Sequence, residues 1–293
     1  MNIERLSIII PVYKQEKNIQ QNLENVYATL KQTPYKFEII AVIDGTNLDK
    51  SFENAKKTKH QSIKVIGYEH NKGKGQAVRF GMQKAKGDVI MFIDAGGDID
   101  PQGLIMLLEH MKWYNADIIV GSKRHQASIV KYPFTRKILS KGYSMLVKIL
   151  FGLKISDTQT GLKAFKRKVL EKSLDRLVVK RFAFDIELLA VANELGFKRI
   201  YEAPVIVNLD FSKSTIKGIF TSNGIWGFVN DTLAVWYRMR ILGYYTDGKN
   251  RVKTFDNELG YYVNTGEMRG KKQRIIEIVN KFFYLIFDLF NRK

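Results

Sequence analysis

The chain has no cysteine among its 293 residues. A disulfide, a zinc–thiolate site, an iron–sulfur cluster and a cysteine nucleophile are therefore excluded, and a reducing compartment is allowed. Acidic residues are also few, because 48 Lys and Arg face 29 Asp and Glu, which gives a formal net charge of +19. This excess predicts a polyanionic partner and leaves nucleic acid, an anionic membrane and phosphorylated substrates open.

The sequence lacks a long uninterrupted apolar run as well. A helix that crosses a bilayer needs about 18 to 20 apolar residues. The best candidate, Ile275 to Phe290, is interrupted by Glu277, Lys281 and Asp288. The run from Leu6 to Val12 is too short for the core of a signal peptide and predicts a strand. We therefore expect a globular protein that does not cross a membrane by itself.

Short β-branched runs alternate with helical patterns in the first part of the chain. This alternation is typical of an α/β fold with a mostly parallel central sheet flanked by helices. We expect strands at 6–12, 37–43, 63–68, 89–93, 118–120 and 200–209, and later helices at 136–151 and 185–195. Functional side chains should gather at the C-terminal ends of the strands.

The pattern changes after Asp210, where two amphipathic segments with basic residues follow. The first carries Trp226, Val229, Leu233 and Trp236 on one face, and the second is the run 275–290. Such helices can lie on an anionic bilayer. We therefore divide the chain into a catalytic domain, 1–210, and a helical, membrane-interfacial tail, 211–293. The alternative is that these helices pack on the catalytic domain or on a membrane-protein subunit.

The most informative segment is GDVIMFIDAGGDIDP at 87–101. A buried strand would deliver Asp94 to its end, and the glycine pair would let the backbone turn so that Asp98 and Asp100 follow within reach. Carboxylates in this arrangement suit a Mg²⁺ or Mn²⁺ ion that bridges a diphosphate. The alternative is a solvated acidic loop in which one aspartate caps a helix.

Motifs along the chain now point to one family. They are IIIPVYKQEKNI at 8–19, AVIDGT at 41–46, NKGKGQAVRFGMQKAKGD at 71–88, FIDAGGD at 92–98, DTQTGLKAF at 157–165 and RFAFDIELL at 181–189. Together they resemble the inverting nucleotide-sugar glycosyltransferases of the GT-A fold, of the family 2 type. The dolichol-phosphate mannose and glucose synthases are the most similar branch, and the resemblance covers roughly residues 5 to 210.

The resemblance implies a role for each matching residue. The nucleotide-sugar site would consist of Pro11, Tyr13, Glu16, Asp44, Lys74, Asp94 and Gln159. The acceptor-phosphate site would consist of Ser122, Lys123, Arg124, Arg136 and Ser140. The catalytic groups would be Asp94, Asp185, Arg124 and Arg136, because the departing diphosphate needs a metal or cationic side chains to neutralise its charge.

One position departs from the family pattern. The usual Asp-x-Asp metal motif reads Asp94-Ala95-Gly96 here, so the second carboxylate is missing. We hypothesise that Asp98 or water replaces it, which would leave a weaker, more Mg²⁺-like site.

The resulting interpretation is transfer of a hexose, mannose or glucose, from GDP-mannose or UDP-glucose to a polyprenyl phosphate, with inversion. The enzyme would be peripheral, on the cytoplasmic face of a membrane. A phosphate acceptor is already anionic at neutral pH and needs no strong base. A sugar-hydroxyl acceptor would need one, and Asp185 is the candidate. Because Asp185 and Glu187 cannot share one helix face, one should face the site and the other should point outward or cap.

Two further alternatives remain. Gly96 could mark a protein that binds nucleotide sugars without transferring them. Nucleic-acid binding would also explain the positive charge, but it predicts basic and aromatic residues interleaved on one surface. The Lys and Arg residues here are scattered, so we do not expect a nucleic-acid partner.

Overall fold

The computed structural model describes residues 3–130, 134–181, 183–208, 222–246, 251–256 and 261–266. The strands are β1 (Arg5–Val12), β2 (Lys36–Asp44), β3 (Ile63–Tyr68), β4 (Val89–Ile93), β5 (Ile118–Ser122), β6 (Ile129–Val130), β7 (Leu162–Lys166), β8 (Ile200–Pro204), β9 (Ile206–Val207), β10 (Arg251–Asp256) and β11 (Tyr261–Gly266). The helices are α1 (Ile19–Leu30), α2 (Ser51–Lys56), α3 (Lys74–Lys84), α4 (Gln102–Trp113), α5 (Phe134–Phe151), α6 (Arg167–Ser173), the short 3₁₀ helix η1 (Leu174–Arg176), α7 (Phe184–Glu194) and α8 (Ser222–Arg240).

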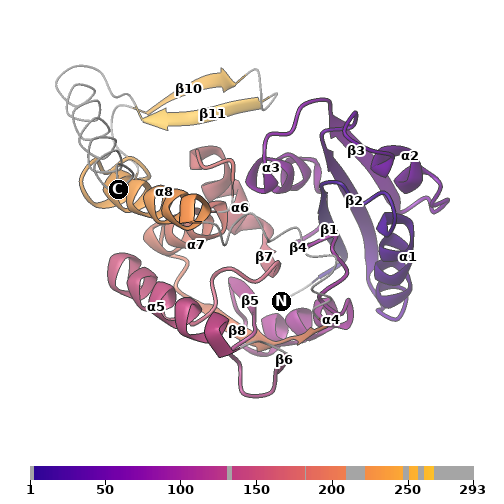
Figure 1. Ribbon diagram of the computed structural model, residues 1–293, viewed down its shortest axis with the longest axis horizontal. Helices are drawn as coiled ribbons and strands as arrows, with labels where there is room; N and C mark the ends of the chain where they lie inside the picture. The colour runs from indigo at the N-terminus through magenta and orange to yellow at the C-terminus, as the bar shows by residue number, and fades with distance from the viewer. Residues whose placement is uncertain are drawn as a thin grey trace.

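Seven strands form the central sheet, in the order β3-β2-β1-β4-β7-β5-β8. All neighbouring pairs are parallel except the two made by β7, which runs antiparallel between β4 and β5. The expected α/β fold with a mostly parallel sheet is thereby confirmed, and helices cover the sheet (Figure 1). The C-terminal ends of β1, β2, β4 and β5 and the start of β7 share one edge, so residues distant in sequence meet there.

The side chains of successive residues in each strand point to opposite faces of the sheet, as the two-residue period of a strand requires. Ile9, Ile40 and Phe92 belong to the apolar core that also holds residues of α3, α5, α6, α7 and α8. Ile8 and Met91 belong to a second core with α1, α2 and α4. Because both faces are covered, the central strands are mostly apolar, and a buried charged side chain among them needs a partner.

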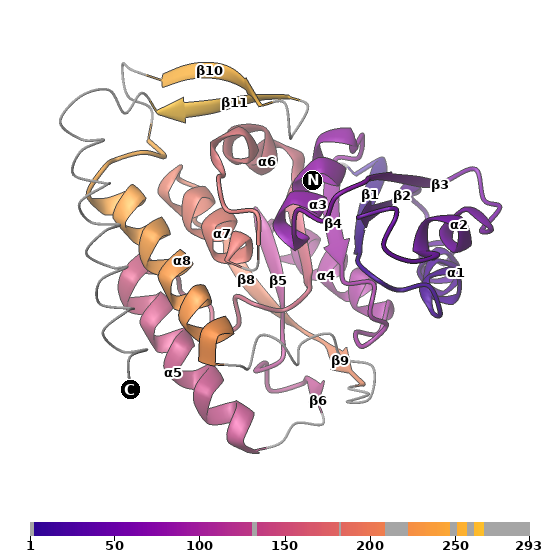
Figure 2. The ribbon, with the colours of Figure 1, turned by 45° about the horizontal axis from the view of Figure 1, so that its top comes forward.

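Helix α8 packs on helices from the preceding part of the chain. Its Val235 and Met239 are buried in the same core as α7, and the Thr232 hydroxyl lies 2.8 Å from the Tyr143 hydroxyl of α5. Figure 2 shows α8 lying against α5 and α7. The helix therefore corresponds to the packed alternative of the sequence analysis.

The rest of the expected tail is only partly described. The tail contains a feature that the helical expectation did not include, the antiparallel hairpin β10–β11. The apolar segment 275–290 and the proposed domain boundary at residue 210 lie outside the described residues. None of the helices in the described ranges is long and apolar enough to cross a membrane.

Candidate active site

Asp44 organises the first part of the site. It ends β2 and is only 3% exposed. Its carboxylate accepts hydrogen bonds from the Asn71 amide at 2.8 Å and from the backbone N–H groups of Lys72 and Gly73 at 2.7 and 2.9 Å. Gly73 has φ +99°, and a side chain there would approach the Lys180 carbonyl at 2.7 Å, so glycine is required. Asp44 thus shapes the loop that leads into α3.

Lys74, the first residue of α3, connects two carboxylates. Its ammonium lies 2.8 Å from Asp94 Oδ1 at the end of β4 and 3.6 Å from Asp185 Oδ2 in the first turn of α7. The other Asp185 oxygen lies 2.5 Å from the ammonium of Lys163, which comes from the middle of β7 and is fully buried. Four charges of alternating sign, Asp94, Lys74, Asp185 and Lys163, therefore form a continuous chain.

The two lysines in this chain differ electrostatically. Burial alone would lower the pKa of Lys74, but the charges of Asp94 and Asp185 outweigh it and raise that pKa above its ordinary value. For Lys163 burial dominates and lowers the pKa, although Asp185 opposes the shift. Lys74 consequently stays a cation beside the end of β4, where a diphosphate would need one.

Gly161 fixes how Asp94 lies. The Asp94 N–H donates to the Gly161 carbonyl at 2.9 Å. A methyl group on Gly161 would come within 1.8 Å of Asp94 Oδ2, so the carboxylate rests directly on this glycine. Gly161 of the DTQTG segment therefore leaves the space that the Asp94 carboxylate at the end of β4 occupies.

The turn after Asp94 bears on metal binding. A Cβ atom on Gly96 would lie 3.3 Å from Asp98 Oδ2, so the Asp98 carboxylate occupies space next to the position where the missing second aspartate would project. The described residues contain no group of three acidic or histidine ligands. Mg²⁺ is commonly held by one or two carboxylates with phosphate oxygens completing its shell, so Asp94 and Asp98 fit such an ion.

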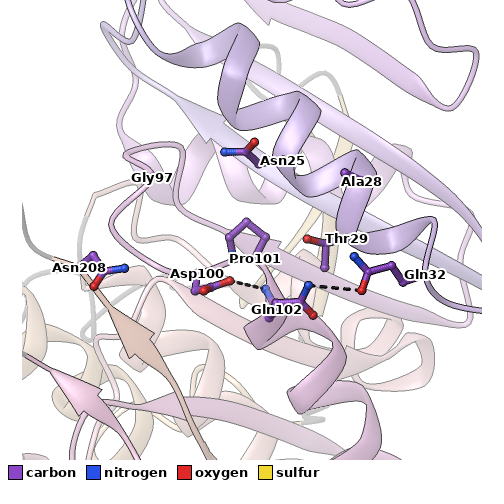
Figure 3. Close-up of a pocket in the computed structure, with 9 residues that line it drawn as sticks. All are labelled: Asn25, Ala28, Thr29, Gln32, Gly97, Asp100, Pro101, Gln102 and Asn208. Atoms are coloured by element: carbon purple, nitrogen blue, oxygen red, sulfur yellow. Dashed lines mark hydrogen bonds between the residues drawn. The ribbon is translucent and has the colours of Figure 1, made fainter.

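Asp100 has a different task from Asp98. Its Oδ1 accepts a hydrogen bond of 2.9 Å from the N–H of Gln102, the first residue of α4. Asp100 also lines a polar pocket of about 380 Å³, in which the Gln102 amide donates to Gln32, just after α1 (Figure 3). Asp100 therefore contacts the first N–H of α4, although Pro101 is the N-cap residue and no side chain of the described residues caps the helix.

Asp157 connects Lys123, which is expected to bind the acceptor phosphate, to the segment that contacts Asp94. It is buried and accepts hydrogen bonds from the Lys123 N–H at 3.0 Å and the Thr160 hydroxyl at 2.6 Å, and the Lys123 ammonium lies 3.8 Å away. Burial would raise the pKa of Asp157, but the Lys123 charge and these hydrogen bonds lower it below its usual value. Asp157 is therefore an anion that places Lys123.

Ser122 and Arg124 flank Lys123 at the end of β5. The Ser122 hydroxyl accepts a 3.2 Å hydrogen bond from the Arg124 N–H and lies 3.4 Å from the Ser156 hydroxyl. Ser156 in turn donates to Glu202 of β8 at 2.7 Å. Arg136 and Ser140 belong to α5, but their side chains lie outside the described part of the structure.

Gln159 carries a side-chain amide nitrogen for which the described residues offer no hydrogen-bond partner. Its backbone N–H donates to Asp157 Oδ1 at 3.2 Å, whereas its side-chain Nε2 is buried and makes no hydrogen bond within the described residues. A buried amide donor without a partner fits a residue that meets a ligand oxygen.

The remaining expected residues lie at the end of β1 and just after it. Pro11 is within β1 and Tyr13 follows it, 38% exposed. Glu16 accepts a 3.2 Å hydrogen bond from the Lys50 N–H. No described hydrogen bond or ion pair joins Tyr13 or Glu16 to the Asp94 group, whereas contacts lead from Asp44 through Asp94 to Lys123.

The expectation for Glu187 was wrong in one respect. Asp185 and Glu187 do point in different directions, but Glu187 does not face outward, because it is completely buried. It accepts hydrogen bonds from the N–H groups of Val178 and Val179 and, at 2.6 Å, from the Tyr245 hydroxyl. Glu187 therefore anchors the segment after α8 to α7.

Sequence reasoning also missed Lys163 and Asp157. Lys163 stands in the apolar strand LKAFK, and a charged residue inside such a strand was the available signal. Asp157 was part of a quoted motif, but nothing local distinguished it from an ordinary turn residue.

Comparison with known proteins supports one family. The model of "Glycosyl transferase family 2" matches residues 7–174. A "Dolichyl-phosphate beta-glucosyltransferase" of Drosophila melanogaster is 33% identical over 225 residues, covering 72% of this chain and 69% of the relative. The Homo sapiens protein of the same name is 32% identical over 220 residues, covering 70% and 67%.

Solved structures agree at the level of the fold. Glucosyl-3-phosphoglycerate synthase from Mycobacterium tuberculosis, solved in complex with Mn²⁺, UDP and phosphoglyceric acid, superposes with a TM-score of 0.59. It is 16% identical, and the match covers 89% of this chain and 86% of that one. The family match, the dolichyl-phosphate relatives and the shared sheet lead to one conclusion: the chain belongs to glycosyl transferase family 2 and is a glycosyltransferase of the GT-A fold.

Proposed function

We propose that this enzyme transfers glucose from UDP-glucose to a polyprenyl phosphate of the dolichyl type. The observation that carries the proposal is the set of relatives named dolichyl-phosphate beta-glucosyltransferase, at 32 to 33% identity over more than two thirds of the chain. Solved fold neighbours hold UDP-glucose with Mn²⁺, which favours the same donor. Mannose and GDP, which the sequence left open, have no comparable support.

The donor would lie along the ends of β1, β2 and β4. Lys74 supports this placement because its ammonium, 2.8 Å from Asp94, stays charged and lies beside the carboxylate that would hold the ion. Asp94 and Asp98 would bind Mg²⁺ or Mn²⁺, which, when bound, would offset charge on the diphosphate. Asp44 would act mainly by holding the loop at 71–73 in place.

The acceptor phosphate would meet Ser122, Lys123 and Arg124, with Arg136 and Ser140 of α5 as further expected ligands. Arginine binds two phosphate oxygens with its planar fork, and Lys123 adds a charge that Asp157 positions. A phosphate oxygen then attacks the anomeric carbon, the bond from that carbon to the diphosphate breaks, and UDP leaves with the electron pair. Attack opposite the leaving group inverts the configuration.

No strong base is needed in this reaction. The surroundings of Asp185 agree with this, because they do not suit a base. Both of its oxygens lie near lysine ammonium groups, so it is suited to position Lys74 and poorly suited to take a proton. This pairing argues against the alternative acceptor, a saccharide hydroxyl, which would require a free carboxylate as base.

A panel of radiolabelled donors tests the proposal. The enzyme is incubated with UDP-glucose or GDP-mannose and vesicles that contain dolichyl phosphate. We expect label from UDP-glucose to enter the organic-solvent extract, and at least about tenfold less label from GDP-mannose. Label that stays only in water-soluble product would contradict the lipid acceptor. Binding of UDP-glucose with neither hydrolysis nor transfer would support a protein that binds nucleotide sugars without catalysis.

The enzyme would work at a membrane surface because its acceptor cannot leave the bilayer. The net charge of +19 favours an anionic leaflet, where each nearby basic residue adds about 1 kcal/mol. Peripheral attachment on the cytoplasmic face, with the segment 275–290 lying at the interface, remains part of this proposal.

A further inference from the structure

The short ribbon of β6 and β9 presents apolar side chains on its outer face. The two strands pair in parallel, with Ile129 opposite Ile206 and Val130 opposite Val207. Val207 is 3% exposed and Val130 packs on the core, whereas Ile129 is 60% and Ile206 39% exposed. A ribbon with one face toward the core normally carries polar residues on the other face. Here both outward positions are isoleucine.

The residues that flank the ribbon contact both the acidic turn after β4 and the end of β5. On one side, the N–H of Asn208 donates to the Asp98 carbonyl at 2.8 Å, which connects the end of β9 to the acidic turn. On the other side, the Ser128 hydroxyl donates to the Ser122 carbonyl at 2.6 Å and accepts from the Val205 N–H at 3.0 Å. Figure 2 shows β6 and β9 at the lower edge of the molecule. Residues next to the exposed isoleucines thus form hydrogen bonds with the acidic turn and with the end of β5, where the expected acceptor residues lie.

The size and charge of this surface decide what kind of partner it fits. Two isoleucines are far too small an area for a stable protein interface, which buries about 1,200 Å² or more. They are enough to add to electrostatic attraction at a bilayer, where a short apolar insertion and nearby basic residues act together. Lys123 and Arg124 precede the ribbon, and the whole chain carries +19.

We propose that Ile129 and Ile206 insert into the interfacial region of an anionic bilayer. The membrane would then meet the enzyme at the ribbon, beside the residues expected to bind the lipid phosphate. This inference rests on the proposed function, and it adds a defined contact surface that is independent of α8 and of the segment 275–290.

The test uses the full-length enzyme with Ile129→Asp and Ile206→Asp together. Trp113→Asp is the matched control, because Trp113 is 86% exposed and ends α4 near the start of β5, at the opposite end of the sheet. Binding to vesicles of phosphatidylcholine and phosphatidylserine without acceptor is measured by co-sedimentation. Turnover is measured with long-chain polyprenyl phosphate in the same vesicles, and with a water-dispersed phosphate of two isoprene units.

We expect the double variant to bind vesicles about tenfold more weakly or worse, and to lose turnover on the vesicle-borne acceptor in parallel. Turnover on the short acceptor should stay within about twofold of the parent, as should all properties of the control. The pair Ile129→Thr and Ile206→Thr, which keeps β-branching, replaces the aspartates if they reduce the yield of folded protein.

Unchanged vesicle binding by the folded double variant would overturn the inference and leave the proposed function standing. An equal loss on both acceptors with unchanged vesicle binding would overturn it too, because the isoleucines would then act within the site. If the parent enzyme transfers glucose to neither acceptor, the proposed function fails, and the vesicle-binding result alone decides whether the ribbon contacts lipid.

Discussion

Lys163 and Asp185 form a buried ion pair among the residues that the structure describes. Both are almost completely buried, 2.5 Å apart, and Lys163 also donates to the Thr160 carbonyl at 2.6 Å. Burying a charge is costly unless a partner compensates it, so removal of one member leaves the other in an apolar surrounding. The ion pair should therefore affect both the stability of the fold and the position of the Lys74 ammonium.

This coupling predicts the outcome of a double-mutant cycle. Asp185→Asn should lower the free energy of unfolding by about 3 to 5 kcal/mol, because the Lys163 ammonium loses its counter-charge. Lys163→Met in the same chain should recover at least about 1 kcal/mol of that loss. Urea unfolding of the parent, the two single variants and the double variant measures these values. Strictly additive losses would show that the pair is not coupled.

Asp98 is the second residue on which the account depends. Asp98→Ala should raise the Mg²⁺ concentration for half-maximal activity by about tenfold or more, because one of two expected ligands is lost. Asp94→Ala should abolish transfer. Asp100→Ala is the control, since the Asp100 carboxylate accepts a hydrogen bond from the Gln102 N–H at the start of α4 and its loss should leave the Mg²⁺ requirement unchanged. Full activity of the parent enzyme in excess chelator would contradict a metal site altogether.

At the scale of elements, the contact between the ends of β4 and β7 shapes the acidic site. Gly161→Ala would place a methyl group 1.8 Å from Asp94 Oδ2 and so displace the carboxylate. A displacement of about 1 Å at a reacting centre can cost about 100-fold in rate. We expect a loss of that order in turnover.

The matched control for this glycine is Gly142→Ala. Gly142 lies in α5, where an added methyl group would meet nothing within 4 Å. Alanine is the better helix former by about 0.5 to 1 kcal/mol, so stability should rise slightly and activity should not change. Turnover of Gly161→Ala within twofold of the parent would mean that the position of Asp94 does not matter.

The sequence was sufficient to predict the strands and helices whose apolar residues recur at the spacing of a strand or a helix. The apolar runs before Asp44, Asp94 and Ser122 are strands, and the predicted helix near 136–151 is α5. The antiparallel direction of β7 could not be predicted, because LKAFK contains no mark of strand direction. The burial of Lys163 and Glu187 also escaped prediction, since both depend on partners more than eight residues away that only the folded chain supplies.

For α8, the buried face overlaps the expected apolar stripe only in part, and Trp236 of that stripe packs against the core. The expected apolar stripe contains Val229 and Leu233, which are only partly buried, whereas Thr232 and Val235 are completely buried. A threonine in the buried face weakens the periodic signal, and its hydroxyl is satisfied there by Tyr143. Periodicity located the helix but not the surface on which it packs.

At the scale of the whole molecule, charge is the dominant property. An excess of 19 positive charges gives long-range attraction to an anionic leaflet, and salt weakens that attraction because the screening length falls from about 10 Å at 0.1 M to about 3 Å at 1 M. Binding to phosphatidylserine vesicles should therefore fall by about tenfold or more between 0.1 and 0.5 M NaCl. Co-sedimentation measures it. Equal binding to neutral and anionic vesicles at all salt concentrations would contradict an electrostatic contribution.

The central claim is that a lipid phosphate oxygen displaces UDP from the anomeric carbon of glucose. Proton NMR of the organic-extractable product formed from UDP-glucose and dolichyl phosphate tests this claim most directly. The account predicts a glucosyl phosphate joined to the polyprenol, with the β configuration that inversion of an α-linked donor produces. An α-linked lipid product would contradict inversion, and a glycosidic bond to a saccharide hydroxyl would contradict the phosphate acceptor.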